Sequence, residues 1–127
     1  MKPVKTNKAP DAIGPYSQAI ISNGFVFTSG QIGLDPATGN IINNNIKSET
    51  EQVIHNLEKI LIKSGSSLSR VVKLNVYLKD LSSFTVLNNV FENFFDKDSY
   101  PARSTFEVSR LPKDVNIEID AVAEIKR

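Results

Sequence analysis

The segment from Ser48 to Gly65 constrains the fold most, because it carries the full set of signals for a helix with one buried face. Residues 48–51, Ser-Glu-Thr-Glu, form a capping box that predicts a helix start at Ser48. Apolar side chains then recur at helical spacing, at Val53, Ile54, Leu57, Ile60 and Leu61. Gly65 predicts the end of the helix. Such a stripe must be buried against another element.

The first third of the chain predicts strands and turns. Ala19–Ser22 and Phe25–Ser29 are apolar, β-prone runs separated by Asn-Gly, the strongest short-range signal for a hairpin. Residues 35–40, Asp-Pro-Ala-Thr-Gly-Asn, predict a turn, because Pro fixes φ early and Gly allows positive φ late. Asn43–Asn45 is interpreted as a polar loop.

The rest of the chain predicts a strand, a helix and two further strands. Residues 70–79 alternate, with a core face made by Val72, Leu74, Val76 and Leu78. A second amphipathic helix is expected after Asp80, with an apolar stripe of Phe84, Leu87, Phe91, Phe94 and Phe95. Residues 102–108 and 117–125 alternate as strands, and both carry ionisable groups on one face.

The resulting order, β-β-α-β-α-β-β, predicts an α+β fold in which two helices pack on one face of a single sheet. We expect one domain over residues 1–127, because this length supports one core. The other sheet face would mix charged groups with Val71, Tyr77 and Val122. Sheets commonly leave one face to solvent, but a mixed face of this kind could equally be an oligomer interface with a polar site inside it.

Composition excludes several classes of function. The chain has no cysteine, so a disulfide, a thiolate nucleophile and a thiolate metal site are excluded. A net charge of +1 gives no electrostatic attraction to nucleic acid or to an anionic membrane. Residues 1–10 lack the apolar segment of a secretory signal, and no apolar run reaches membrane-spanning length. The expected location is the cytoplasm, or an organelle if a transit peptide has been removed.

Several short motifs lie in order along the chain. Pro-Ala-Arg-Ser at 101–104 is followed by Leu-Pro at 111–112 and Ile-Glu-Ile at 117–119. Upstream lie Ile-Gly-Pro-Tyr-Ser-Gln-Ala at 13–19, Ser-Gly-Gln at 29–31 and Leu-Lys-Asp-Leu at 78–81. Together with the asparagine- and phenylalanine-containing helix at 88–95, they resemble the motifs of the reactive intermediate deaminase family, also called RidA or YjgF. The resemblance covers nearly the whole chain.

The resemblance implies a homotrimer of chorismate-mutase-like architecture, with ligand clefts between subunits. It implies hydrolytic deamination of reactive 2-imino or enamine acids, such as 2-iminopropanoate and 2-iminobutanoate, to 2-keto acids and ammonia. It implies no metal and no organic cofactor. The expected partners are therefore a small imino or keto acid and further copies of the chain. No membrane partner is expected, and the near-neutral charge disfavours nucleic acid as a partner.

Two residues match the family's catalytic positions. Arg103 would bind the substrate carboxylate, because a guanidinium offers a rigid pair of donors to a carboxylate. Glu118 would orient water or carry a proton, because imine hydrolysis needs water at carbon and protons at nitrogen. The alternative interpretations are a surface strand arginine paired with Glu107 or Glu118, and an exposed strand glutamate.

Five further positions match the family's substrate-binding residues: Tyr16, Ser29, Gly30, Asn88 and Thr105. Many family members carry cysteine where this chain has Thr105, so we expect Thr105 to act mainly through its backbone. Gly30 would allow a close backbone approach, because glycine has no Cβ. The alternatives are a packed tyrosine at position 16, a bulge or tight strand end at Ser29-Gly30, and a helix-surface asparagine at position 88. His55, the only histidine, is expected at the surface or half-buried.

Strand geometry raises a question about the catalytic pair. If the two final strands formed a simple hairpin, Arg103 would lie opposite Val122, four residues or roughly 13 Å along the strand from Glu118. For both to contact one small ligand, the strands must pair differently or the two residues must come from different chains. The sequence leaves both possibilities open.

Two other functions remain as alternatives. RNA cleavage or translation inhibition, also associated with the family, is disfavoured by the near-neutral charge. A non-catalytic ligand sensor or chaperone-like trimer is the second, and the presence of Arg103 weighs against it.

Overall fold

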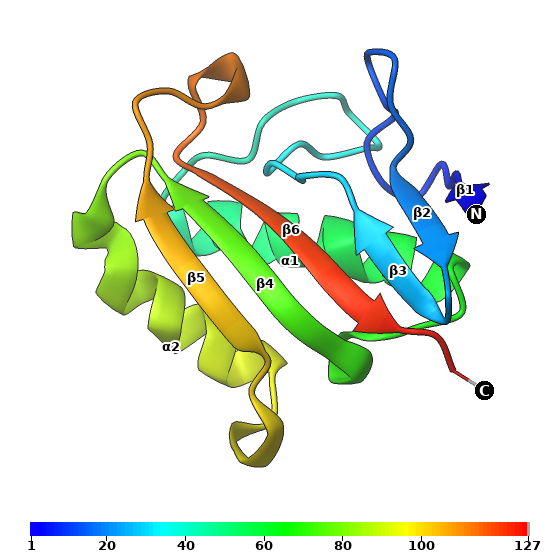
Figure 1. Ribbon diagram of the computed structural model, residues 1–127. Helices are drawn as coiled ribbons and strands as arrows, with labels where there is room; N and C mark the ends of the chain where they lie inside the picture. The colour runs from blue at the N-terminus through cyan, green and yellow to red at the C-terminus, as the bar shows by residue number, and fades with distance from the viewer. Residues whose placement is uncertain (127) are drawn as a thin grey trace.

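The computed structural model describes residues 1–126, which form one mixed sheet with both helices on the same face (Figure 1). The strands are β1 (Lys2–Val4), β2 (Ala19–Ser22), β3 (Phe25–Thr28), β4 (Val71–Leu78), β5 (Ala102–Glu107) and β6 (Ile117–Glu124). Their order is β1-β2-β3-β6-β4-β5, and only β4 and β5 run parallel. The helices are α1 (Ile46–Lys63) and α2 (Phe84–Phe94). The predicted α+β fold of one sheet and two helices is therefore confirmed.

The first strand was not predicted. Lys2–Val4 pairs antiparallel with β2 and forms one edge of the sheet, while β5 forms the other. Pro3 and two lysines hide any alternating pattern in this segment. Proline is tolerated there because the outer side of an edge strand needs no backbone donor.

The Asn-Gly hairpin is confirmed. Ser22 and Phe25 are the last register pair of β2 and β3, and the two residues between them form the turn. Asn23 has φ 52° and Gly24 has φ 81°, as a tight turn that matches the twist of its strands requires.

The first helix begins two residues before the predicted capping box. Asn45 is the N-cap, and its side-chain oxygen accepts a hydrogen bond from the Ser48 amide at 2.8 Å. The prediction of a cap at Ser48 is therefore wrong, and the polar loop at 43–45 contains the cap itself. The apolar stripe of α1 is buried as expected, and Gly65 follows the helix with φ 84°. Neither helix, nor any other in residues 1–126, is long and apolar enough to span a membrane.

A β-bulge changes which valine of β4 enters the core. The register with β6 shifts between Val71 and Lys73, so Val71 is buried and Val72 is 37% exposed. The prediction that Val72 belongs to the core face is wrong, because a bulge reverses the alternation of side chains beyond it. After the bulge, Leu74, Val76 and Leu78 face the helices as predicted.

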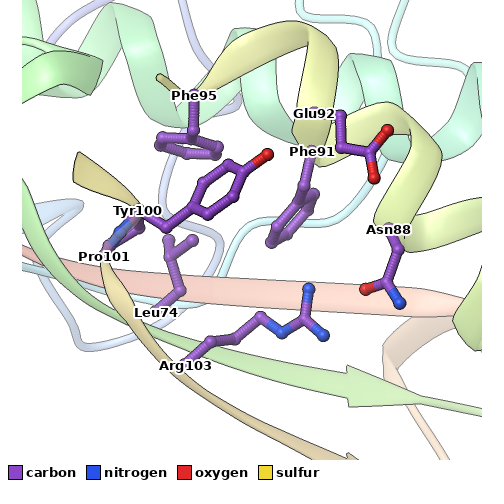
Figure 2. Close-up of a pocket in the computed structure, with 8 residues that line it drawn as sticks. All are labelled: Leu74, Asn88, Phe91, Glu92, Phe95, Tyr100, Pro101 and Arg103. Atoms are coloured by element: carbon purple, nitrogen blue, oxygen red, sulfur yellow. The ribbon is translucent and has the colours of Figure 1, made fainter. Parts of the chain in front are cut away.

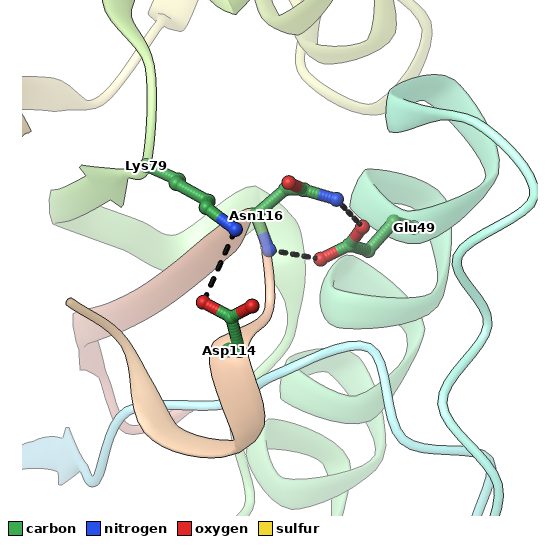
Figure 3. Close-up of polar contacts among 4 residues, drawn as sticks. All are labelled: Glu49, Lys79, Asp114 and Asn116. Atoms are coloured by element: carbon green, nitrogen blue, oxygen red, sulfur yellow. Dashed lines mark hydrogen bonds and ion pairs between the residues drawn. The ribbon is translucent and has the colours of Figure 1, made fainter.

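A buried carboxylate ties α1 to the start of β6 (Figure 3). Glu49 is fully buried, and its two oxygens accept hydrogen bonds from the backbone and side-chain nitrogens of Asn116, each at 2.8 Å. Lys79 and Asp114 add an exposed ion pair of 3.1 Å across the same loop. These contacts fix the loop that leads directly into the strand carrying Glu118.

Candidate functional site

Arg103 lies on the helix-covered side of the edge strand β5. It shares a register position with the buried Leu74 of β4, so the two side chains point to the same face. Its guanidinium carbon is 5.2 Å from the ring centres of both Phe84 and Phe91 in α2, which is cation–π geometry. Burial lowers the pKa of Arg103 from its ordinary value.

The guanidinium faces a cavity of about 290 Å³ between β5 and α2 (Figure 2). The cavity is lined by Leu74, Asn88, Phe91, Glu92, Phe95, Tyr100, Pro101 and Arg103. Within residues 1–126 the two ion pairs are His55–Glu58 and Lys79–Asp114, so Arg103 is paired with neither Glu107 nor Glu118. The alternative of a surface arginine neutralised by a strand glutamate is therefore not realised within this chain.

Glu118 lies on the opposite, open face of the sheet. It is the register partner of Tyr77 in β4, and its neighbours Ile117 and Ile119 point into the core. Burial, and secondarily the negative charge of Asp120, raise the pKa of Glu118 above its ordinary value. A half-buried carboxyl with a raised pKa is a stronger base than an ordinary glutamate and is therefore suited to proton transfer.

Gly30 packs directly against Glu118. A Cβ added at Gly30 would lie 2.8 Å from the Cδ atom of Glu118, closer than real contacts allow. Gln31 holds the segment there, because its backbone exchanges hydrogen bonds of 2.8 and 3.1 Å with Ile119. The carboxyl group of Glu118 therefore packs directly against the backbone of Gly30, with no side chain between them.

Tyr16 and Ser29 belong to the surroundings of Gly30. Tyr16 is half-exposed and lines, together with Gly30, a cavity of about 480 Å³. The Ser29 hydroxyl donates to the carbonyl of Ser17 at 2.6 Å, and the Ser29 amide donates to the carbonyl of Gln18 at 2.8 Å. Ser29 thus holds the backbone before Gly30, whereas Tyr16 offers a hydroxyl at the cavity.

The expected site residues form two separate groups. Asn88 lines the Arg103 cavity, and Thr105 lies on β5 on the same face as Arg103. Tyr16, Ser29, Gly30 and Glu118 form the second group, around β3 and β6.

The expected catalytic residues do not converge within one chain. The last two strands do not form a hairpin, because β4 lies between β5 and β6. Arg103 is level with Ala121, three residues or about 10 Å along β6 from Glu118. The two side chains also leave opposite faces of the sheet. One chain therefore cannot bring both to the same small ligand.

Sequence reasoning missed the aromatic contacts of Arg103, because both phenylalanines were assigned to the core. Phe91 is buried, but Phe84 is 41% exposed. Their seven-residue spacing places them on one side of α2, two turns apart. That spacing indicated a shared face, but only the packing of α2 beside β5 shows that the face meets an arginine.

A lysine-lined groove was also missed. It lies between residues 5–8 and the end of α1, and its lining includes Lys5, Lys8, Lys59 and Lys63. These lysines are distant in sequence, so a search for a local run of basic residues does not find them.

His55 is exposed at the surface of α1, with its Nδ1 atom 4.0 Å from Glu58 and its ring edge-on to Phe94. In residues 1–126, no three His, Cys, Asp or Glu side chains gather in a way that would hold a metal.

Comparison with known proteins matches nearly the whole chain. Residues 6–125 match the family model described as Endoribonuclease L-PSP. Human 2-iminobutanoate/2-iminopropanoate deaminase is 41% identical over 94% of this chain and 87% of its own length. RidA from an Antarctic Psychrobacter superposes with a TM-score of 0.94 at 42% identity, covering 98% of this chain and 100% of that one. TdcF from E. coli with bound serine gives 0.93 at 39% identity, covering 99% and 100%.

Proposed function

Because this chain belongs to the RidA family, which includes imine deaminases, we propose that it hydrolyses reactive 2-imino acids to 2-keto acids and ammonia. The observation that carries the proposal is Arg103, an arginine with no ion-pair partner in residues 1–126, held against two aromatic rings at a cavity.

Arg103 would bind the substrate carboxylate. Its guanidinium is half-buried and already oriented by Phe84 and Phe91, so little side-chain freedom is lost when a carboxylate binds. Apolar side chains in the cavity lining, among them Leu74 and Phe91, lower the local dielectric constant and so strengthen the charge–charge contact. The bound serine of TdcF supports a small carboxylate as the kind of ligand.

Glu118 would act as the acid–base group. Water adds to the carbon of the protonated imine while Glu118 accepts one of the water protons, which gives a neutral carbinolamine. Glu118 then returns that proton to nitrogen, and ammonia departs as the C–N bond breaks. The proton of the remaining hydroxyl passes to the departing ammonia, which leaves the keto group and an ammonium ion. The raised pKa of Glu118 favours this exchange, because it makes the carboxylate a stronger base than an ordinary glutamate.

The complete site would be shared between two copies of the chain. The carboxylate carbon of a 2-imino acid is bonded directly to the imine carbon, so the groups that bind them must lie close together. Arg103 and Glu118 do not meet within one chain. We therefore propose that the β5 edge of one copy, carrying Arg103 and Thr105, faces Gly30 and Glu118 of the next.

A closed ring satisfies this arrangement, because two different surfaces meet head to tail. We propose a homotrimer, as the family resemblance implies. The open sheet face supports an interface, since it exposes aromatic side chains that no helix covers: Phe25, Phe27 and Phe106. Polar groups in the same face, among them Glu118, would then be enclosed by the assembly.

RNA cleavage is the second candidate function, suggested by the family's description. The observation in its favour is the groove of four lysines beside α1. The residues that line this groove include no His, Asp or Glu to serve as acid or base for cleavage. The deaminase proposal therefore has the stronger support.

A coupled assay tests the proposed activity. A threonine dehydratase generates the imino acid, semicarbazide traps what remains, and keto-acid release is followed. We expect the wild-type protein to accelerate release, and Arg103→Ala to lose at least about 100-fold in kcat/KM, because it removes the half-buried charge that would bind the substrate carboxylate.

Arg110→Ala is the matched control, since Arg110 is an exposed arginine in the loop after β5. It should retain full turnover. Full turnover by the Arg103→Ala protein would contradict the proposal.

A further inference from the structure

A second carboxylate lies beside Glu118 on the open face, and the reaction steps above do not use it. Asp120 is two residues from Glu118 on β6, so both side chains leave the strand on the same side. One Asp120 oxygen accepts a hydrogen bond from the Asn75 amide at 2.8 Å, and the other accepts one from the Tyr77 hydroxyl at 3.0 Å.

The two carboxylates have different surroundings. Asp120 accepts two hydrogen bonds from β4, one from Asn75 and one from Tyr77, which fix the position of its carboxylate. Glu118 packs against Gly30, and within residues 1–126 its carboxyl group accepts no side-chain hydrogen bond. The negative charge of Asp120 disfavours the ionised form of Glu118, and no side-chain donor in residues 1–126 offsets that effect.

We propose that Asp120 is a positioning residue for imine hydrolysis: held by Asn75 and Tyr77, its fixed negative charge makes Glu118 the carboxyl that accepts and returns the proton. This inference rests on the proposed deaminase function for its purpose. Its physical content, the coupling between two carboxylates, can be measured without any turnover.

The other groups around Glu118 do not replace the effect of Asp120. From β4, Tyr77 lies opposite Glu118 and donates its hydroxyl to Asp120. Lys79, further along β4, has its Nζ atom 3.1 Å from Asp114. From the β3 side the contact is Gly30, which has no charge. Within one copy, burial raises the pKa of Glu118 and Asp120 is the one charge that adds to that shift. In the proposed trimer Arg103 of the next copy also faces Glu118, and its positive charge acts in the opposite direction.

Removing the charge of Asp120 should therefore lower the pKa of Glu118. The test is a carbon-13 titration of side-chain carboxyls in the full-length protein, with Glu118→Gln used to assign the Glu118 signal. Asp120→Asn should move the Glu118 midpoint to lower pH. Asp120→Ser should also move the Glu118 midpoint to lower pH. Because serine packs differently from asparagine, this second variant keeps the test valid if the first folds poorly.

Glu124→Gln is the matched control, because it removes a charge from the same face of β6 at its exposed end. It should leave the Glu118 midpoint unchanged. A midpoint that stays in place in both Asp120 variants would overturn the inference, whether or not the protein hydrolyses imines.

The kinetic consequence separates this inference from the proposed function. Where the wild-type protein is active, the acid limb of kcat/KM should move to lower pH in Asp120→Asn, in parallel with the titration. A shifted titration without any deaminase activity would retain the coupling and reject the reaction. An active enzyme with neither shift would retain the reaction and reject the role of Asp120.

Discussion

At the residue scale, Gly30 shows how the absence of one carbon atom shapes the candidate site. Its φ angle is not positive, so its backbone does not require glycine. The requirement comes from Glu118, whose carboxyl group occupies the space that a Cβ would fill. The glycine of the Ser-Gly-Gln motif is therefore explained by contact with the side chain of Glu118 on β6, 88 positions further along the sequence.

Gly30→Ala should displace Glu118 while leaving the fold intact, because the atoms in the way belong to the movable end of a side chain. We expect kcat to fall about 100-fold, as for other displacements of a catalytic group by about 1 Å. The coupled assay and a thermal melt measure the two effects.

Gly24→Ala is the opposite case. Gly24 has φ 81° in the hairpin turn, with nothing within 4 Å of an added Cβ. The Gly24→Ala protein should lose about 1 kcal/mol of stability, because alanine is strained at positive φ. Its turnover should be unchanged. Full activity in Gly30→Ala would show that the position of Glu118 is not critical.

At the scale of elements, the sequence predicted local structure well and pairing poorly. The hairpin at Asn23-Gly24, the stripe of α1 and the alternation of β6 depend on neighbouring residues, and all three are confirmed. Insertion of β4 between β5 and β6, by contrast, is a long-range arrangement that no local pattern specifies. The bulge at Val71 and the short edge strand β1 were missed for the same reason.

The site shows the same division. The candidate site residues were identified from the family resemblance. The separation of Arg103 from Glu118 follows instead from the order of the strands and from the opposite sheet faces on which the two side chains lie. The spacing of Arg103 and Glu118 along their strands already indicated that a simple hairpin would keep them apart. Their actual separation depends on the register of three strands, β4, β5 and β6.

The link between α1 and β6 gives a prediction at this scale. Glu49→Ala should destabilise the protein by about 3 kcal/mol, because two buried donors of Asn116 lose a charged acceptor. Glu49→Gln should cost about 1 kcal/mol, since an amide can still accept one of these bonds. Urea denaturation measures both. Equal stability of all three proteins would show that the Glu49–Asn116 contact does not stabilise the fold.

At the scale of the whole molecule, the sheet presents one covered and one uncovered face (Figure 1). The covered face supplies the core. The uncovered face combines exposed aromatic side chains with Glu118 and Asp120. A homotrimer would cover this face and, in the same step, join the two groups of site residues.

The most direct test of this account is complementation between two inactive variants. Arg103→Ala and Glu118→Gln are expressed separately and together, and keto-acid release is measured for each preparation. Every mixed trimer contains one interface with both wild-type residues, so random assembly of equal amounts should restore about a quarter of wild-type activity. Activity no higher than that of either variant alone would contradict a site built from Arg103 of one subunit and Glu118 of the next.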